Sequence, residues 1–222
     1  ISAAWDKDSA PDRGAFNDAD LDAKKLAIFS GFGVLKLIPQ SRPYLQKLIA
    51  VDYHDLIAEP LGGRDLDNHA YKGQLNIFKN KQELEKGVDE GIYEKDGVEK
   101  LINSINDNDK KRFQDEMSNK VNRFIAMGLN PEMYSYLGGD VYNLTELITK
   151  FNGEDYYLLF ERELGISVRC EPLKKIFESG LSPYVAWHTS RDPVNFLCRA
   201  PVDGIRPAAE AMRILINQNF DN

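Results

Sequence analysis

The sequence predicts an α+β protein in which an antiparallel β meander, or small barrel-like sheets, pack against several helices. Between residues 96 and 127 apolar residues recur with the i, i+3, i+4, i+7 spacing of helices that bury one stripe. Between residues 141 and 171 apolar and polar residues alternate instead, as in strands. With 42% hydrophobic and 28% charged residues in 222, the composition fits one large globular domain or two small ones.

The first half is expected to form an N-terminal arm over residues 1–26 and then a β-rich segment with helices over residues 27–130. The arm is rich in Asp and Ala and also resembles a loose helix start. The strands expected after it cover Leu26–Leu37, Tyr44–Ala58 with a break at Asp52–Asp55, and Ala70–Phe78.

Three helices are expected next. Asn80 can cap the first, which ends near Gly87, and Glu83 stands where a capping box needs it. The second covers Asp96–Ile105. The third covers Asp109–Met127, with Gly128 in the position of a helix-ending glycine.

Residues 131–203 are expected to contain the meander. Its first hairpin turns at Asn152-Gly153, because this dipeptide accepts the positive φ angles of a type I′ turn. The three strands expected are Val141–Thr149, Tyr156–Phe160 and Ile166–Glu171. A helical turn over Lys174–Ser179 and a strand over Pro183–Thr189 follow.

A helix is expected over residues 204–222, with Asp203 as its N-cap and Pro207 in its first turn. The helical pattern still runs at Asn222 and the chain begins with Ile1, so we expect a fragment whose helix continues. One apolar stripe of this helix is our candidate for a subunit interface: Ile205, Ala208, Ala209, Met212, Leu215 and Ile216.

The net charge of −7 argues against a protein that holds nucleic acid tightly, since such proteins neutralise phosphates with clustered Lys and Arg. No apolar run approaches the roughly 20 residues that span a bilayer, so no membrane partner is expected.

No catalytic, cofactor-binding or metal-binding residue is assigned. The sequence has no GxxxxGK[ST], GxSxG or HExxH motif and no GxGxxG after a strand. His54 and His69 flank a Pro-Gly turn beside several acids, so they are either ligands of a metal site or polar residues that lie at the surface or cap the turn. We favour the interpretation as surface or turn-capping polar residues.

The two cysteines, Cys170 and Cys198, are interpreted as buried reduced thiols, with Cys170 facing the core from an alternating strand. The alternative is a thiol–imidazole pair with His188. It is disfavoured because a nucleophilic thiolate usually sits at a helix N-terminus or in a cationic pocket.

The order of several segments resembles the portal protein of tailed bacteriophages, the head-to-tail connector. A Pro-aromatic-Val step at Pro183–Val185, the Asp192–Pro193 pair and the helix start at Asp203-x-x-Arg206-Pro207 carry most of the likeness. The segments are VDYHDLIAEPLGGRDLDNHAYKG from Val51, NKQELEKGVDEGIYEKDGVEKL from Asn80, and the meander with the stretch from Ser182 into the last helix.

This resemblance implies a portal wing-like fold, with the last helix as the truncated start of a long stem-side helix. It implies a non-enzymatic subunit of a homo-oligomeric ring, a dodecamer, at one capsid vertex, through which duplex DNA passes during packaging and ejection. Capsid protein, terminase and tail adaptor would be its partners, in the virion and, during assembly, in the host cytoplasm. The alternatives are another virion component, such as an adaptor or ejection protein, or a metal-dependent hydrolase or nuclease.

Overall fold

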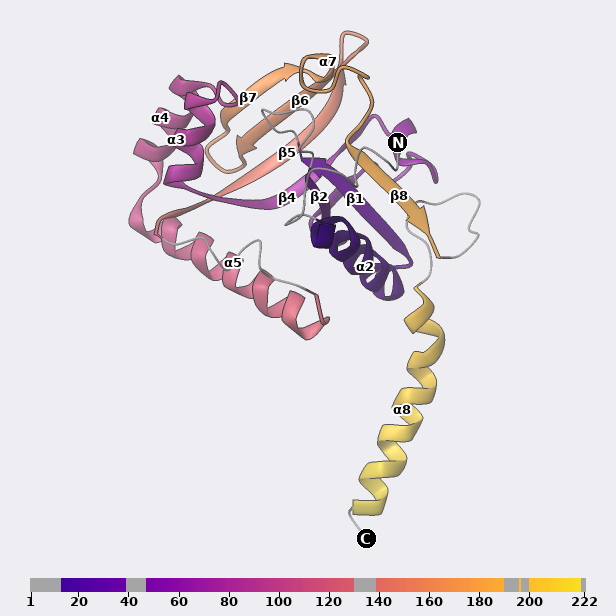
Figure 1. The fold of residues 1–222 in the computed structure, drawn as a ribbon. Coiled ribbons are helices and arrows are strands. Elements are labelled where there is room, and N and C mark those ends of the chain that lie inside the picture. The colour runs from indigo at the N-terminus through magenta and orange to yellow at the C-terminus, as the bar shows by residue number, and fades with distance from the viewer. Residues whose placement is uncertain (1–12, 39–46, 130–138, 190–195, 197–199, 221–222) are drawn as a thin grey trace.

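The computed structural model describes residues 13–38, 47–129, 139–189, 196 and 200–220, and it confirms the α+β class (Figure 1). A three-stranded antiparallel sheet has the order β2-β1-β8, and a five-stranded one has the order β3-β4-β5-β6-β7. Neither sheet closes on itself, so the expectation of barrel-like sheets is wrong for this part of the chain. The three-stranded sheet consists of β1 (Phe32–Ile38), β2 (Lys47–Ala50) and β8 (Tyr184–His188). The five-stranded sheet consists of β3 (Leu56–Ala58), β4 (Tyr71–Asn80), β5 (Val141–Phe151), β6 (Glu154–Glu161) and β7 (Ile166–Pro172).

The first helix corrects the start of the strand expected from Leu26, and it agrees with the loose helix start considered for the arm. Helix α2 (Arg13–Ser30) occupies the second half of the arm and the first five residues of the strand expected from Leu26. Its buried residues, Ala19, Ala23, Leu26 and Ala27, share one face. Small alanines on that face let the helix lie close to its neighbours, a use of Ala that composition alone does not reveal. Gly31, with φ 86°, then turns the chain into β1.

The expected meander is confirmed as β5, β6 and β7. At its first turn Asn152 has φ 51° and Gly153 has φ 83°, the two positive angles of a type I′ turn. The strand break at Asp52–Asp55 is also confirmed, since it separates β2 from β3.

The helices between the sheet strands follow the sequence closely. They are α3 (Lys81–Asp89), α4 (Lys95–Ser104) and α5 (Asp107–Ala126). Asn80 and Glu83 form the predicted capping box of α3. Helix α5 begins two residues before the expected start, because Asn106 caps it by accepting two backbone N–H groups. Helix α4 lies along β7 (Figure 1), where the Glu94 N–H donates to the Val168 carbonyl at 2.8 Å and so covers part of that sheet edge.

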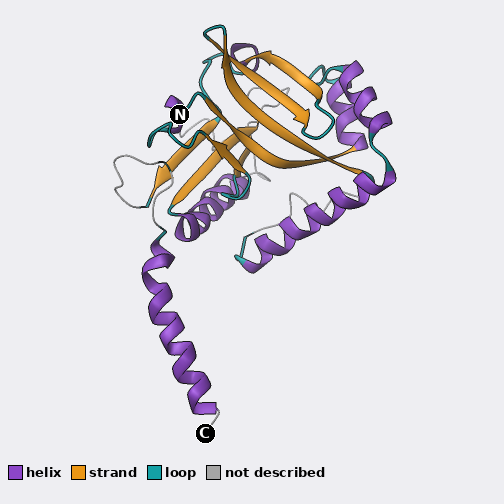
Figure 2. Ribbon diagram, turned by 180° about the vertical axis from the view of Figure 1, so that it is seen from behind, coloured by secondary structure: helices purple, strands orange, loops and turns teal. Residues whose placement is uncertain are grey.

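The last helix, α8 (Pro201–Phe220), extends away from the body in both views (Figures 1 and 2). The prediction that Asp203 is its N-cap is wrong. Asp203 lies in the first turn of the helix and accepts a hydrogen bond from the Ala200 N–H at 3.3 Å. The proline that occupies the first helical position is Pro201, so Pro207 falls inside the helix rather than in its first turn. None of the described helices has the length and apolar character that crossing a bilayer requires.

Two short elements complete the description: η1 (Leu66–Asn68) before β4, and α7 (Leu173–Ile176) after β7, shorter than the turn expected there. The main core lies between the sheets and under α3 and α4, and includes Val34, Leu101, Leu144 and Leu159. A second core cluster joins α2 and α5 to the ends of β4 and β5.

Candidate functional site

The interior contains two groups of buried charged side chains, which are the most unusual feature of the molecule. The first, the Glu146 cluster, is defined by Lys36, Gln74, Glu146, Tyr157 and Tyr184. The Glu146 carboxylate is 1% exposed and lies 2.8 Å from Lys36 Nζ. It accepts from the Tyr157 hydroxyl at 2.5 Å and from the Tyr184 hydroxyl, while Lys36 also donates to Gln74 Oε1 at 3.0 Å.

The Glu146 cluster connects the two sheets. Lys36 and Tyr184 come from β1 and β8, whereas Gln74, Glu146 and Tyr157 come from β4, β5 and β6. Burial lowers the pKa of Lys36, and the nearby carboxylate opposes that shift. Burial and the negative charge of Glu146 raise the pKa values of both tyrosines well above their ordinary range. The tyrosines therefore remain neutral donors to the carboxylate.

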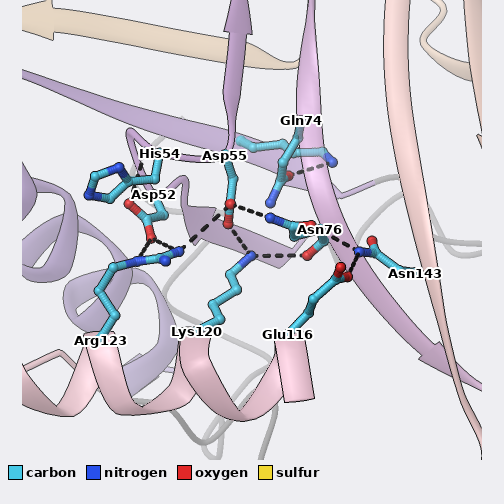
Figure 3. Close-up of polar contacts among 10 residues, drawn as sticks. Asp52, His54, Asp55, Gln74, Asn76, Glu116, Lys120, Arg123 and Asn143 are labelled. Carbon is cyan, nitrogen blue, oxygen red and sulfur yellow. Dashed lines mark hydrogen bonds and ion pairs between the residues drawn. The ribbon is translucent and has the colours of Figure 1, made fainter. Parts of the chain in front are cut away.

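The second group, the Asp55 cluster, attaches α5 to the sheets (Figure 3). Lys120 Nζ lies 2.5 Å from Asp55 Oδ2, and these two side chains are 2% and 1% exposed. One turn further along α5, Arg123 donates from Nε to Asp52 Oδ2 at 2.8 Å and also lies 3.7 Å from Asp55. Both aspartates belong to the turn between β2 and β3, which the Asp55 N–H closes by donating to the Asp52 carbonyl at 2.9 Å.

A β-bulge in β4 completes the Asp55 cluster. The register with β5 shifts between Gln74 and Ile77, and Asn76 inside the shift has φ 55°, an angle that Asn tolerates better than most residues. The Asn76 carbonyl accepts from Lys120 at 3.0 Å, and its side-chain amide donates to Asp55 at 2.7 Å. Asn143 then bridges the Asn76 side chain and Glu116 at 2.9 and 2.7 Å (Figure 3).

Both clusters contain buried charges of opposite sign that are matched with each other. The carboxylates of Asp52, Asp55 and Glu146 are buried, and each is matched by a cation from another element. Beside the Asp55 cluster, a cavity lined by Asn76, Glu116 and other residues holds about 20 Å³, room for a water molecule or two. No group of three or more His, Cys, Asp or Glu side chains among the described residues could hold a metal ion.

The two histidines weighed as metal ligands have structural roles. His69 is 1% exposed, its Nδ1 accepts from the Glu59 N–H at 3.1 Å, and its Nε2 therefore donates to the Gly63 carbonyl at 2.9 Å. Because both ring nitrogens are occupied, His69 holds the turn together, and it does so from a buried position rather than from the surface. His54 stacks on Tyr53, with ring centroids 4.1 Å apart.

The prediction that Cys170 faces the core is wrong. Cys170 is exposed, and its neighbour Arg169 takes the buried position because a register shift in β7 changes the alternation. Cys198 lies outside the described residues. His188 belongs to the other sheet, where its Nε2 lies 2.9 Å from the Phe196 carbonyl.

The candidate interface on α8 is exposed to solvent at the positions whose side chains the structure describes. Ile205 and Met212 are 63% and 65% exposed, and Ala208 is exposed as well. The side chains of Ala209, Leu215 and Ile216 fall outside the described part.

Sequence reasoning missed both buried clusters, although the pattern contained a signal for each. Lys120 lies on the same helical stripe as Phe113, Met117 and Phe124, where a charged residue is out of place. Glu146 likewise interrupts the inward row of β5.

No known family model matches this sequence, and no curated protein is significantly similar to it.

Proposed function

We propose that the chain is a structural subunit of a phage portal ring, and that α8 forms part of the contact between neighbouring subunits. The observation that carries this proposal is the exposed apolar stripe of α8. Ile205 and Met212 lie two helical turns apart, on one face, and more than half of each side chain is exposed. Helices in proteins draw most of their stability from packing an apolar face, so the uncovered stripe supports a contact with another chain.

The buried clusters agree with a role in which the two sheets and α5 must pack in one specific arrangement. Each cluster joins elements from different layers through ion pairs: Lys36–Glu146 between the sheets and Lys120–Asp55 between α5 and the β2–β3 turn. Such pairs contribute little net stability, but a wrong packing would leave a charge buried and unpaired. A subunit that must match identical neighbours around a ring benefits from this specificity.

The surface charges agree with transient passage of duplex DNA. The chain is acidic overall, and several exposed cations are paired with acids: Lys24–Asp20, Lys86–Glu90, Lys95–Glu99 and Arg206–Glu210. A channel wall with few unpaired cations adds little salt-dependent electrostatic binding of the DNA phosphates. By the resemblance, the partners of the ring are capsid protein, terminase and tail adaptor, in the virion and in the host cytoplasm during assembly.

Sedimentation of the intact protein tests this proposal. The wild type should sediment as a closed oligomer, and the double variant Ile205→Glu/Met212→Glu should sediment as a smaller species with an unchanged circular dichroism spectrum. Leu61→Glu is the matched control, because Leu61 is 93% exposed but lies far from α8 in sequence, in the β3–β4 connection. A strict monomer that degrades DNA with Mg²⁺ would replace the portal proposal by the nuclease alternative.

A further inference from the structure

The outward side of the five-stranded sheet carries two rows of uncharged residues. Strand pairing aligns one row across all five strands: Ile57, Gly73, Leu147, Leu158 and Cys170. It aligns the next row across four: Tyr71, Thr149, Tyr156 and Pro172. Residues directly opposite each other point to the same side of a sheet, so these nine residues share one surface. Phe151, two residues after Thr149, extends it toward the hairpin turn.

We name this surface the open sheet face. Its large apolar residues, Ile57, Leu147, Tyr156 and Leu158, are half-buried and belong to neither core cluster, although their inward neighbours do. Tyr71 and Phe151 are 38% and 61% exposed. The usual pattern of a sheet with one solvated side is therefore reversed, since the charged residues Lys72 and Glu146 lie on the buried side.

Helix α5 covers only the other end of the same side. Phe78 and Val141 point outward there and pack with Phe124 of α5 in the second core cluster. The second core cluster does not reach the end of the sheet at the Asn152-Gly153 hairpin, since none of its described members lies there. A sheet face this apolar needs a second layer.

We infer that the open sheet face receives α8 of a second copy of the chain, an inference that rests on the proposed ring. Helix α8 carries the complementary unpaired surface, the stripe with Ile205 and Met212, and it extends away from its own body (Figures 1 and 2). A contact between two different surfaces of one subunit repeats from copy to copy, and it closes into a ring when the rotation permits.

Charge and size fit this occupant. Helix α8 carries two acids, Asp203 and Glu210, and two bases, Arg206 and Arg213, so it approaches an acidic neighbour without net repulsion. The uncharged rows of the sheet add no opposing charge. Five strands spaced at about 4.8 Å and four residues of strand length give a face of roughly 19 by 14 Å. Helix α8, with a rise of about 1.5 Å per residue and a diameter of about 10 Å, is long enough to span the side of about 19 Å and covers about 10 Å of the roughly 14 Å width.

The small size of this contact agrees with a closed ring better than with an isolated pair. Two matched footprints of roughly 200 Å² each (about 10 by 19 Å) fall below the total of about 1,200 Å² that a stable isolated pair buries. In a closed ring every subunit makes this contact twice, and dissociation of one subunit breaks both.

Cys170 provides the test because it lies exposed at the end of the first row. In a Cys198→Ser background it is the only thiol, since the sequence has two cysteines. We expect the intact ring to react with a maleimide at Cys170 at least tenfold more slowly than the dissociated Ile205→Glu/Met212→Glu variant. In the same background Met212→Cys should permit a bismaleimide to join position 212 of one subunit to Cys170 of the next, whereas Leu61→Cys should not.

The outcomes separate the two proposals. A ring whose Cys170 reacts as fast as in the variant, with no cross-link to position 212, overturns this inference and leaves the proposed function standing. Slow reaction in both ring and variant overturns it too, because the face would then be covered by its own chain or by another protein. A protein that forms no ring at all removes the proposed function together with the inference.

Discussion

Replacing Lys120 by Met removes the cation of a fully buried ion pair while keeping most of the side-chain volume. Asp55 then retains the Asn76 amide at 2.7 Å and the Arg123 guanidinium at 3.7 Å. Breaking a buried pair costs about 3–5 kcal/mol because a charge is left uncompensated. Since two of the three partners of Asp55 remain, we expect a loss of unfolding free energy at the lower end of this range, about 3 kcal/mol. In a chain of this size that lowers Tm by about 6–12 °C.

The assay is urea unfolding followed by fluorescence, with Lys86→Met as the matched control. Lys86 forms an exposed pair with Glu90 at 3.8 Å, and its side chain is 75% exposed. Its loss should cost less than about 1 kcal/mol. The double variant Asp55→Asn/Lys120→Met should cost less than the sum of the two single variants, because no buried charge remains unpaired. Equal losses for the Lys120 and Lys86 variants would refute the argument that the buried pair specifies the packing of α5.

Three further predictions follow from particular contacts. The raised pKa values of Tyr157 and Tyr184 mean that their stabilising effect is complete below about pH 10, the ordinary tyrosine value, and is lost as pH rises through their folded values. A pH series of urea midpoints should fall above pH 10, and changing both residues to Phe should flatten the fall; an unchanged slope would contradict this. Gly153→Val should cost about 1 kcal/mol or more, because φ 83° strains a β-branched residue, and an unchanged Tm would count against the type I′ hairpin. Gly62→Ala should lower Tm because its Cβ would lie 2.4 Å from a buried imidazole ring, whereas Gly204→Ala, with open space around it, should not; equal Tm values for the two variants would be the contrary result.

The sequence was most informative where local chemistry decides the structure. The capping box at Asn80 and the Asn152-Gly153 turn depend on a few neighbouring residues, and both were predicted correctly. A loose helix start was one interpretation of this segment, but the full extent of helix α2 was not predicted, because its buried face is built from Ala19, Ala23 and Ala27, which give no strong apolar period.

The buried clusters could not be predicted because their members meet only through tertiary pairing. Lys36 and Glu146 are separated by 110 positions, and no local sequence pattern around either residue indicates that the two form a pair. The position of Lys120 on an apolar stripe, and of Glu146 in an inward row, could have identified two buried charges. Their partners depend on how the two sheets stack, which no single strand encodes.

Counting subunits in electron micrographs of the intact protein tests the central claim most directly. We predict closed rings with rotational symmetry, in which the bodies surround a channel and the α8 helices contact neighbouring subunits. Particles of single-subunit size at every concentration, together with Mg²⁺-dependent cleavage of duplex DNA, would contradict the portal proposal.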